Sequence, residues 1–360
     1  MQNTLRSRRS HRSRVLALTS VVAGAALALS ACSNSSDDDA AAGGSTASGP
    51  ADYGDLAVQL SWIKNSEFLG EYMADTNGYY KDAGFSKVNL VAGPSTGVAE
   101  LVSKKADVAL SDAVSVGTAV ANEDAPVKII GTTYQKNPFT VLSLKDGANI
   151  STPQDLVGKK IGVQDSNLSL FQALLAANGI DKSKVTVVPV QYDPSVLTNG
   201  EVDGYIAYLT NESIIVENEG HAVTNLPFAD NGLPFVAETF TVTDDSIKND
   251  RAELEAFLTA EIKGWKDALK DPAGAIAVDQ KSYGQDLKLD AKTEAQSADA
   301  QAKLIESDDT TTNGLFTISD ELQQETLKSL EGAGLKLEAS DLFDMSLLDD
   351  VYKAHPELKG

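Results

Sequence analysis

Few side chains in this chain could carry out covalent or metal chemistry. Its 360 residues include one cysteine, Cys32, and three histidines, of which only His221 and His355 lie beyond residue 31. No His-x-x-x-His or Cys-x-x-Cys spacing offers a transition-metal site, and the glycine-rich loop at 93–97 lacks the lysine of a P-loop. We therefore expect no enzyme, no cofactor and no metal site.

Residues suited to binding a ligand follow the short apolar runs that we expect to be strands. Trp62 and Asn65 come after the run 56–60, and Asp112 and Gln135 come after later runs. In open α/β sheets, ligands bind beyond the carboxyl ends of the strands, where loops lead into helices. A tryptophan at such a position can stack on a flat ring, although Trp62 could also simply cap the core.

The second half of the chain repeats this arrangement. Its candidates, each of which follows a predicted strand or ends it, are Asp165, Ser166, Tyr192, Asp193, Tyr208, Asn211 and Glu212. An amide beside a carboxylate, as at Asn211 and Glu212, can hydrogen-bond the edge of an aminopyrimidine-like ring. The structural alternatives are strand packing for the tyrosine at 208, a helix cap for the amide and carboxylate, and a turn for Tyr192 and Asp193.

The expected charge around the cleft bears on the kind of ligand. Loops before helices at 95–96 and 166–167 could offer backbone N–H groups to an oxyanion, but ordinary capping explains them as well. Four carboxylates are expected to border the cleft: Asp112, Asp165, Asp193 and Glu212. Little positive charge lies nearby beyond Lys64 and Lys136. This balance favours a neutral or weakly cationic ligand over nitrate or a sulfonate.

Short apolar runs alternate with segments of helical period, which is typical of an α/β fold with largely parallel strands. The first half has predicted strands at 56–60, 88–91, 108–110 and 127–132, and predicted helices at 68–80, 98–104 and 115–122. The second half has predicted strands at 139–144, 160–163, 185–190, 204–208 and 222–226, and predicted helices at 168–178 and 193–198. A strand at 235–243 should return to the first half, and residues 250–360 are strongly helical.

These elements predict two α/β lobes joined by two crossing strands. We expect lobe 1 at 55–138 and 243–360, and lobe 2, with the hinge strands, at 139–242. Polar side chains from both lobes would then converge when the lobes close.

The N-terminus has the pattern of an export signal. Five arginines precede an apolar run at 15–29 that is too short to span a membrane. The run ends in Leu29-Ser30-Ala31-Cys32, which resembles a bacterial lipobox. We predict a signal peptide at 1–31, lipidation of Cys32 and a flexible, Ser-, Asp- and Ala-rich linker at 32–54. The protein is then expected on the extracytoplasmic face of the cell membrane; the alternative is an ordinary secreted protein.

The chain is strongly acidic. Its formal net charge is −22, and removal of the first 31 residues with their five arginines would leave −27. A charge of this sign and size argues against nucleic acid as a partner. With a single cysteine, the chain cannot form an internal disulfide.

Several segments carry a family resemblance. They are Val-Gln-Leu-Ser-Trp at 58–62, Ser-Thr-Pro-Gln-Asp-Leu-Val-Gly-Lys-Lys-Ile-Gly-Val at 151–163, Gly-Glu-Val-Asp-Gly at 200–204 and Tyr-Leu-Thr-Asn-Glu at 208–212. From about residue 56 to 240 the chain resembles the solute-binding proteins of nitrate, sulfonate and thiamine-precursor transporters, the NMT1/THI5-like superfamily. The segment at 208–212 is similar to members that bind the thiamine pyrimidine precursor or related heteroaromatic vitamins.

The resemblance implies a two-lobed, periplasmic-binding-protein-like fold of type II. It also implies a monomeric solute-binding component of an ABC importer, which delivers a small heteroaromatic vitamin precursor to permease and ATPase subunits. Two alternatives stay open: a binder of alkanesulfonate, nitrate or another small oxyanion, and a surface lipoprotein without a role in transport.

Overall fold

The computed structural model describes residues 51–360. The signal peptide predicted at 1–31, the lipidation site predicted at Cys32 and most of the linker predicted at 32–54 lie outside the described residues. None of the helices within 51–360 is both long enough and apolar enough to cross a membrane.

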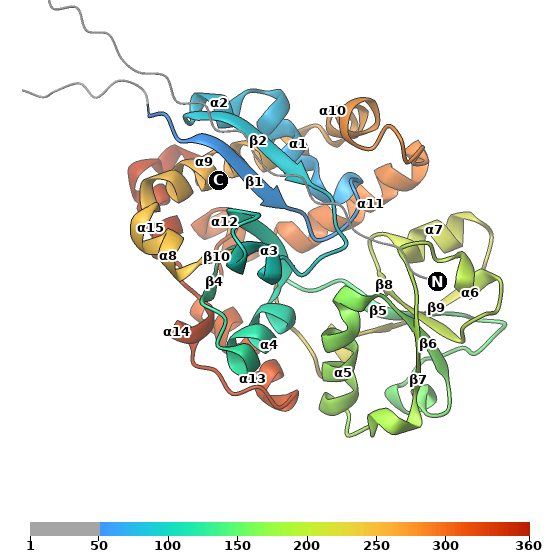
Figure 1. Cartoon of the computed structure of the whole chain (residues 1–360). Helices are drawn as coiled ribbons and strands as arrows, with labels where there is room; N and C mark the ends of the chain where they lie inside the picture. Colours follow the sequence, from blue (N-terminus) through green and yellow to red (C-terminus); the bar gives the residue numbers. More distant parts are fainter. Residues whose placement is uncertain (1–50) are drawn as a thin grey trace, which may run out of the picture. The chain divides into compact units, whose positions relative to one another are not determined.

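The first sheet has five strands in the order β2-β1-β3-β10-β4. Their bounds are β1 (Gly54–Gln59), β2 (Phe85–Val91), β3 (Val108–Asp112), β4 (Val127–Tyr134) and β10 (Ala237–Thr243). Every residue of β3 is buried, which is expected of a central strand covered on both faces. Four helices follow its strands: α1 (Leu69–Thr76), α2 (Tyr79–Asp82), α3 (Val98–Val102) and α4 (Ala113–Glu123). We call the part of the chain that packs around this sheet lobe 1 (Figure 1).

The second sheet also has five strands, in the order β7-β6-β8-β5-β9. Their bounds are β5 (Phe139–Leu144), β6 (Lys160–Val163), β7 (Thr186–Pro189), β8 (Gly204–Tyr208) and β9 (Val223–Pro227). Its helices are α5 (Leu168–Ala177), α6 (Ser195–Thr198) and α7 (Glu212–Asn218). We call the part around this sheet lobe 2; it is drawn in green to yellow in Figure 1.

The chain crosses between the sheets twice, from β4 to β5 and from β9 to β10 (Figure 1). β5 and β10 run antiparallel to both of their neighbours, so each sheet is mixed rather than largely parallel. The strand predicted at 235–243 is β10, and its backbone bonds place it between β3 and β4. This strand returns to the first sheet, as predicted, and it lies within the range 139–242 that was given for lobe 2 and the hinge strands.

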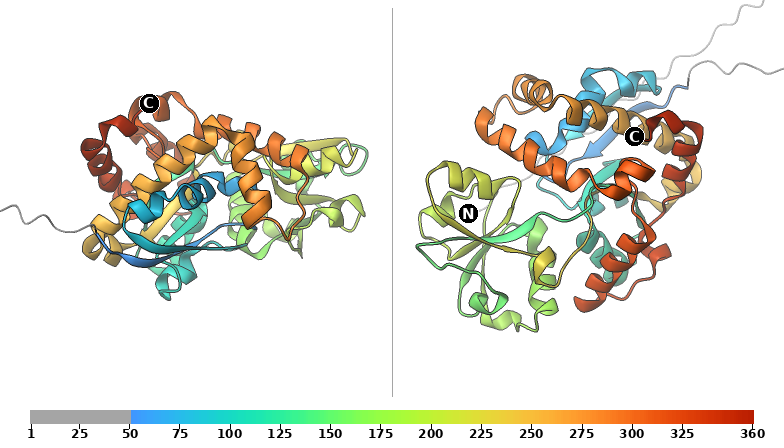
Figure 2. Two further views of the ribbon diagram at one scale, coloured as in Figure 1. Left: turned by 90° about the horizontal axis from the view of Figure 1, so that it is seen from above. Right: turned by 180° about the vertical axis from the view of Figure 1, so that it is seen from behind.

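The C-terminal third is helical, as predicted. Its helices are α8 (Asp244–Asn249), α9 (Arg251–Lys270), α10 (Pro272–Val278), α11 (Ala291–Ile305), α12 (Asp308–Asn313), α13 (Asp320–Gly332), α14 (Ala339–Leu342) and α15 (Ser346–Ala354). In the view from behind, these orange to red helices gather around lobe 1 (Figure 2). α11 also meets α7 of lobe 2, where Asn218 donates to Thr293 Oγ1 at 2.9 Å.

The prediction of one continuous helix at 68–80 is wrong, because the structure has a 3-10 turn and two separate helices there. A short 3-10 turn at Ser66–Phe68 precedes α1, which ends at Thr76, and Gly78 then adopts a left-handed conformation with φ of 77° before α2 begins. Glycine reaches this conformation without steric cost, so it ends one helix and redirects the chain into the next.

Two glycines let α1 and α9 pack in very close contact. A Cβ atom added at Gly70 would lie 2.2 Å from the ring of Trp265, and one at Gly264 would lie 2.2 Å from the carbonyl oxygen of Gly70. Trp265 itself is fully buried in the core. The absence of both side chains therefore sets the distance between these helices.

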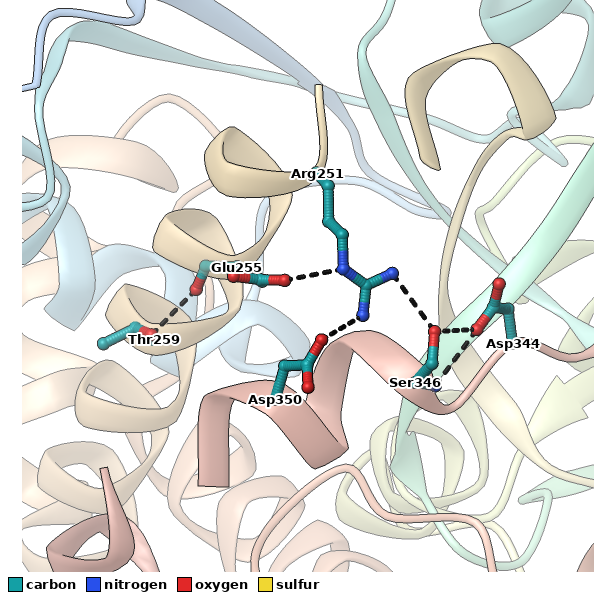
Figure 3. Close-up of polar contacts among 6 residues, drawn as sticks. All are labelled: Arg251, Glu255, Thr259, Asp344, Ser346 and Asp350. Atoms are coloured by element: carbon teal, nitrogen blue, oxygen red, sulfur yellow. Dashed lines mark hydrogen bonds and ion pairs between the residues drawn. The ribbon is translucent and has the colours of Figure 1, made fainter. Parts of the chain in front are cut away.

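Arg251 joins α9 to α15 (Figure 3). Its Nε lies 2.9 Å from Glu255 Oε1, one Nη lies 2.5 Å from Asp350 Oδ2, and the other donates to Ser346 Oγ at 3.2 Å. Arg251 is the only arginine in the sequence after residue 50. Because these contacts lie within lobe 1, its guanidinium supplies no positive charge to the cleft.

Candidate functional site

A narrow pocket lies between the lobes, at the carboxyl ends of central strands of both sheets. Lobe 1 contributes Ser61, Trp62, Glu67, Ser95, Thr96, Ser111, Asp112 and Glu238. Lobe 2 contributes Phe139, Gln164, Ser166, Asn167, Ile206, Ala207, Tyr208, Asn211 and Glu212. The cavity volume is about 40 Å³, which is room for a few water molecules.

The pocket brings together about half of the residues predicted from the sequence. The predicted residues that line it are Trp62, Asp112, Ser166, Tyr208, Asn211 and Glu212. They come from the ends of β1, β3, β6 and β8, which are neighbouring inner strands of the two sheets. Placement in the pocket makes them candidates for ligand contact.

The other predicted residues do not line this pocket. Asn65 accepts a hydrogen bond from Glu67 N and caps the short 3-10 turn, and Gln135 donates to Thr317 O at 3.0 Å. Asp165 begins a 3-10 turn beside the pocket. Tyr192 is 44% exposed, and Asp193 accepts from Ser195 N. Gln135 and the pair at 192–193 follow β4 and β7, which are edge strands and so end away from the centre of the cleft.

Two carboxylates in the pocket were not predicted, Glu67 and Glu238. Glu67 is 7% exposed and Glu238 is 2% exposed. A glutamate is out of place within a buried strand such as Ala237–Thr243, since a charge is costly to bury without a partner. That contrast within β10 is the signal that could have identified Glu238.

Glu238 connects the two lobes. It has φ of 50°, an unusual value for a residue other than glycine, and the pairing of β10 is irregular beside it. Its carboxylate accepts from Ser61 Oγ at 2.8 Å in lobe 1 and from Tyr208 Oη at 2.9 Å in lobe 2. Unusual backbone conformations of this kind concentrate at functional sites.

The two aromatic candidates sit in different surroundings. The ring of Tyr208 packs edge-on against Phe139, with 4.5 Å between centroids and 87° between planes, and lies near Tyr134. Trp62 is 9% exposed and has no aromatic partner within residues 51–360. Tyr208 is therefore fixed by its neighbours, whereas no aromatic ring occupies the faces of Trp62.

Local backbone contacts fix the other acidic candidates. Asp112 caps α4 by accepting from Val114 N and Ser115 N, both at 2.9 Å. Glu212 accepts from Tyr208 N at 2.8 Å and from Asn211 Nδ2 at 3.3 Å. Asp112 is therefore a helix cap, whereas Asn211 and Glu212 make no side-chain cap of α7, so the helix-cap alternative for this pair is wrong.

Four carboxyl groups line the pocket, and no lysine, arginine or histidine does. Burial raises the pKa of Glu212 and of Glu238 to about 7. Burial first, and then the charges of Glu238 and Glu212, raise the pKa of Glu67 well above its usual value. Burial also raises the pKa of Asp112, against the effect of its capping hydrogen bonds. Part of this acidic set is therefore protonated near neutral pH.

A second group of buried acids lies behind the pocket, in the core of lobe 1. Glu71 and Glu261 are fully buried on α1 and α9, and Tyr80 Oη donates to Glu261. Neither glutamate forms an ion pair within residues 51–360. Burial raises the pKa of Glu261 to about 8, and burial followed by the charge of Glu261 raises that of Glu71.

We expect the stability of the protein to fall as the pH rises from about 5 to 8. Folded Glu261 holds its proton up to a pKa of about 8, whereas the unfolded chain releases it near 4.5. The contribution of Glu261 to the free energy of unfolding is therefore fully present below about pH 4.5 and is lost as the pH rises through 8. The free energy of unfolding of a Glu261→Gln variant should depend less on pH than that of wild type. At pH 8 it should be higher than that of wild type by about 1 kcal/mol or more. Urea unfolding at each pH measures this.

Glu331→Gln, on the exposed face of α13, is the matched control and should leave the pH dependence as it is in wild type. An equal pH dependence in wild type and Glu261→Gln would contradict the assignment of this proton to Glu261.

Metal chemistry has no support in the geometry. Within residues 51–360, no cluster of three or more Asp, Glu, His or Cys side chains has an arrangement that could hold a metal ion. The pocket carboxylates instead meet hydroxyl and amide groups. The arrangement suits the binding of an uncharged or positively charged organic ligand.

Comparisons with known proteins identify the family of the chain. Residues 65–275 match the family model described as NMT1/THI5 like. The formylaminopyrimidine-binding protein of Halalkalibacterium halodurans is 24% identical over 241 residues, which cover 65% of this chain and 72% of that protein. The riboflavin-binding protein RibY of Chloroflexus aurantiacus is 26% identical over 259 residues, which cover 68% of each chain.

The fold is that of a periplasmic binding protein. The structure of the alkanesulfonate-binding protein SsuA from Xanthomonas axonopodis pv. citri superposes with a TM-score of 0.61 at 14% identity, over 80% of this chain and 96% of that one. This similarity confirms the predicted two-lobed fold and carries no information on the ligand.

Proposed function

Since the chain belongs to the NMT1/THI5-like family, as the resemblance predicted, we propose that it is the extracytoplasmic solute-binding component of an ABC importer. The proposed ligand is a small heteroaromatic vitamin precursor of the thiamine-pyrimidine type. The observation that carries this proposal is the pocket itself, in which Trp62 and Tyr208 lie with Asn211 and Glu212 between two lobes joined by two crossing segments.

In this proposal the lobes open and close around the ligand. Trp62 and Tyr208 flank the planar ring, and Asn211 and Glu212 hydrogen-bond its polar edge. The cavity of about 40 Å³ is too narrow for a ring to enter without separation of the lobes. The crossing segments before β5 and before β10 are the natural hinges, and the closed form then docks on the permease.

The charge of the pocket argues against the oxyanion alternative. Nitrate or a sulfonate would meet four carboxyl groups and no cationic side chain in the pocket. An anion in such surroundings loses its hydration without gaining an opposite charge.

A thermal-shift screen of the purified protein tests the proposed ligand class. Formylaminopyrimidine, riboflavin, an alkanesulfonate and nitrate are each added in excess. A ligand that binds only the folded state raises the melting temperature, and we expect the pyrimidine to do so most. A rise with the sulfonate or nitrate alone would overturn the proposed ligand class.

We also propose that the lipid on Cys32 holds the protein at the outer face of the membrane. The support is the lipobox-like sequence Leu29-Ser30-Ala31-Cys32 and the polar linker after it. A Cys32→Ala variant is expected to appear in the soluble fraction, because the acylated thiol is lost. Its continued presence in the membrane fraction, compared with wild type by immunoblot, would contradict the anchor.

A further inference from the structure

The side-chain groups of the pocket are unevenly divided between donors and acceptors. Its amide donors are already bonded within the protein: Gln164 to Ile206 O at 3.0 Å, Asn167 to Gln164 Oε1 at 3.0 Å, and Asn211 to Glu212 Oε1 at 3.3 Å. Acceptors, in contrast, remain open. The hydroxyls of Ser111 and Ser166 are unpartnered, and the ionisable groups of the pocket are all carboxyls, which can accept from N–H or O–H donors of a ligand.

Glu67 and Glu238 form a pair of neighbouring carboxyl groups beside Ser61. Ser61 Oγ lies 2.8 Å from Glu238 Oε2 and 3.5 Å from Glu67 Oε1, and one hydroxyl has only one proton to donate. The shorter distance assigns that proton to Glu238. The carboxyl groups of Glu67 and Glu238 are also hydrogen-bonded to each other, so the pair shares one proton.

An independent group in the same pocket lacks a partner. The hydroxyl of Ser111 lines the pocket, the residue is 3% exposed, and no described group is within hydrogen-bonding reach of its oxygen. Buried polar groups are nearly always bonded in native proteins, so an orphan at a pocket wall points to a ligand.

The charges around this pair of glutamates are all of one sign. The groups around the pair are Glu212 and Asp112 in the pocket, Glu71 on α1, and the hydroxyls of Ser61, Tyr134 and Tyr208. No lysine, arginine or histidine within residues 51–360 is buried. Positive charge in the pocket must therefore come from the ligand.

We infer that the ligand meets Glu67 and Glu238 with a positively charged, N–H-bearing edge, such as an amidinium or a protonated aminopyrimidine. This inference rests on the proposed function and adds the charge of the ligand and the residues that recognise it. An amidine edge has two parallel N–H groups, which match two carboxylate oxygens. A neutral ring of the same shape would leave the proton of the pair in place and gain no attraction between opposite charges.

The entry of such a cation displaces a proton. Because the pKa of Glu67 is raised by burial and by the nearby Glu238, the pair holds a proton near neutral pH. When the cation binds, that proton leaves one carboxyl oxygen for solvent, and the cation takes its place. The total charge of the occupied pocket then equals that of the free pocket. Affinity for a cation should consequently rise with pH, by up to about tenfold per unit.

The test compares two probes of the same shape, benzamidine, a cation between pH 5 and 8, and benzamide, which is neutral. Isothermal titration of the purified protein measures both affinities at pH 5, 6, 7 and 8. We expect benzamidine to bind about tenfold tighter than benzamide at pH 8, and its affinity to rise with pH while that of benzamide stays constant.

The variants assign this preference to the two glutamates. Glu67→Gln/Glu238→Gln keeps the shape of both side chains and should weaken benzamidine binding by about tenfold, abolish its pH dependence and leave benzamide within about twofold. Glu331→Gln, which changes an exposed acid on α13 outside the pocket, is the control and should behave as wild type. If the double variant does not fold, as judged by its thermal unfolding, the single Glu67→Gln variant carries the test.

Two results would overturn the inference: equal or absent binding of the two probes by wild type, or an unchanged preference in the folded variant. The outcomes also separate this inference from the proposed function. Preference for benzamidine without a thermal shift by any pyrimidine keeps the inference and removes the proposed ligand class. Binding of formylaminopyrimidine without a preference for benzamidine over benzamide keeps the proposed ligand class and removes the inference.

Discussion

Replacement of Gly264 by alanine is expected to lower the free energy of unfolding by about 3 kcal/mol. The new Cβ atom would lie 2.2 Å from the carbonyl oxygen of Gly70 and 2.8 Å from the Cβ and backbone nitrogen of Ala74. Two of these atoms belong to the backbone of α1, so no side-chain rotation can relieve the overlap. The helices must move apart, and the packing around Trp265 opens with them.

Urea unfolding followed by circular dichroism measures the loss. Gly332→Ala is the matched control, since Gly332 is also helical and an added Cβ there would have no atom within 4 Å. That change should be neutral or stabilise the protein by up to about 1 kcal/mol, because alanine favours the helix. Equal stabilities of Gly264→Ala and wild type would show that α1 and α9 are further apart than the structure has them.

The second large effect concerns the ligand. Trp62→Ala should weaken the binding of formylaminopyrimidine by about tenfold or more, which corresponds to a loss of about 1.4 kcal/mol or more. The indole follows β1 and lines the pocket, and no other aromatic ring packs on it among the described residues. In the proposed mode of binding, its pocket-facing side stacks on the planar ring once the lobes have separated. Alanine removes both the stacking surface and the apolar area that the ligand would cover.

Isothermal titration of wild type, Trp62→Ala and Trp62→Phe tests this prediction. Phenylalanine retains a ring, so that variant should keep most of the affinity. Because Trp62 is largely buried, the thermal unfolding of each free variant is measured in parallel. A folded Trp62→Ala variant with wild-type affinity would remove the stacking role from the proposal.

The sequence predicts individual elements of this fold well. Runs such as 108–110 and 204–208 are strongly apolar and bounded by polar or glycine residues, and both are strands in the structure. The helix at 68–80 was predicted as continuous because its apolar spacing continues past the glycine at 78. Local pattern alone could not show that this glycine adopts a left-handed conformation.

The order of the strands explains which site residues could be predicted. Trp62 and Asp112 follow inner strands and line the pocket, whereas Gln135 and Tyr192 follow edge strands and do not. All four look alike in the sequence, since each comes directly after an apolar run. Pairing between strands far apart in the chain decides between them, and that information is absent from local periodicity.

Glu238 was not predicted as a site residue for a related reason. It lies within β10, and a regular strand predicts only alternation between its two faces. The irregular pairing beside Ala237 and the positive φ of Glu238 turn the carboxylate into the cleft. Neither feature has a signature in the surrounding residues beyond the presence of a charge in a buried segment.

The hydrogen bond between Tyr208 and Glu238 gives the protein a means of rejecting wrong ligands. A molecule that occupies the cleft while drawing this carboxylate away from the tyrosine must replace the bond with a donor of its own. One that cannot do so leaves a buried acceptor unsatisfied, at a cost of about 1–3 kcal/mol. Affinity is thereby reduced for compounds of suitable shape but wrong edge chemistry. For the proposed ligand, selectivity among similar rings then depends on this exchange of partners more than on the fit of the ring.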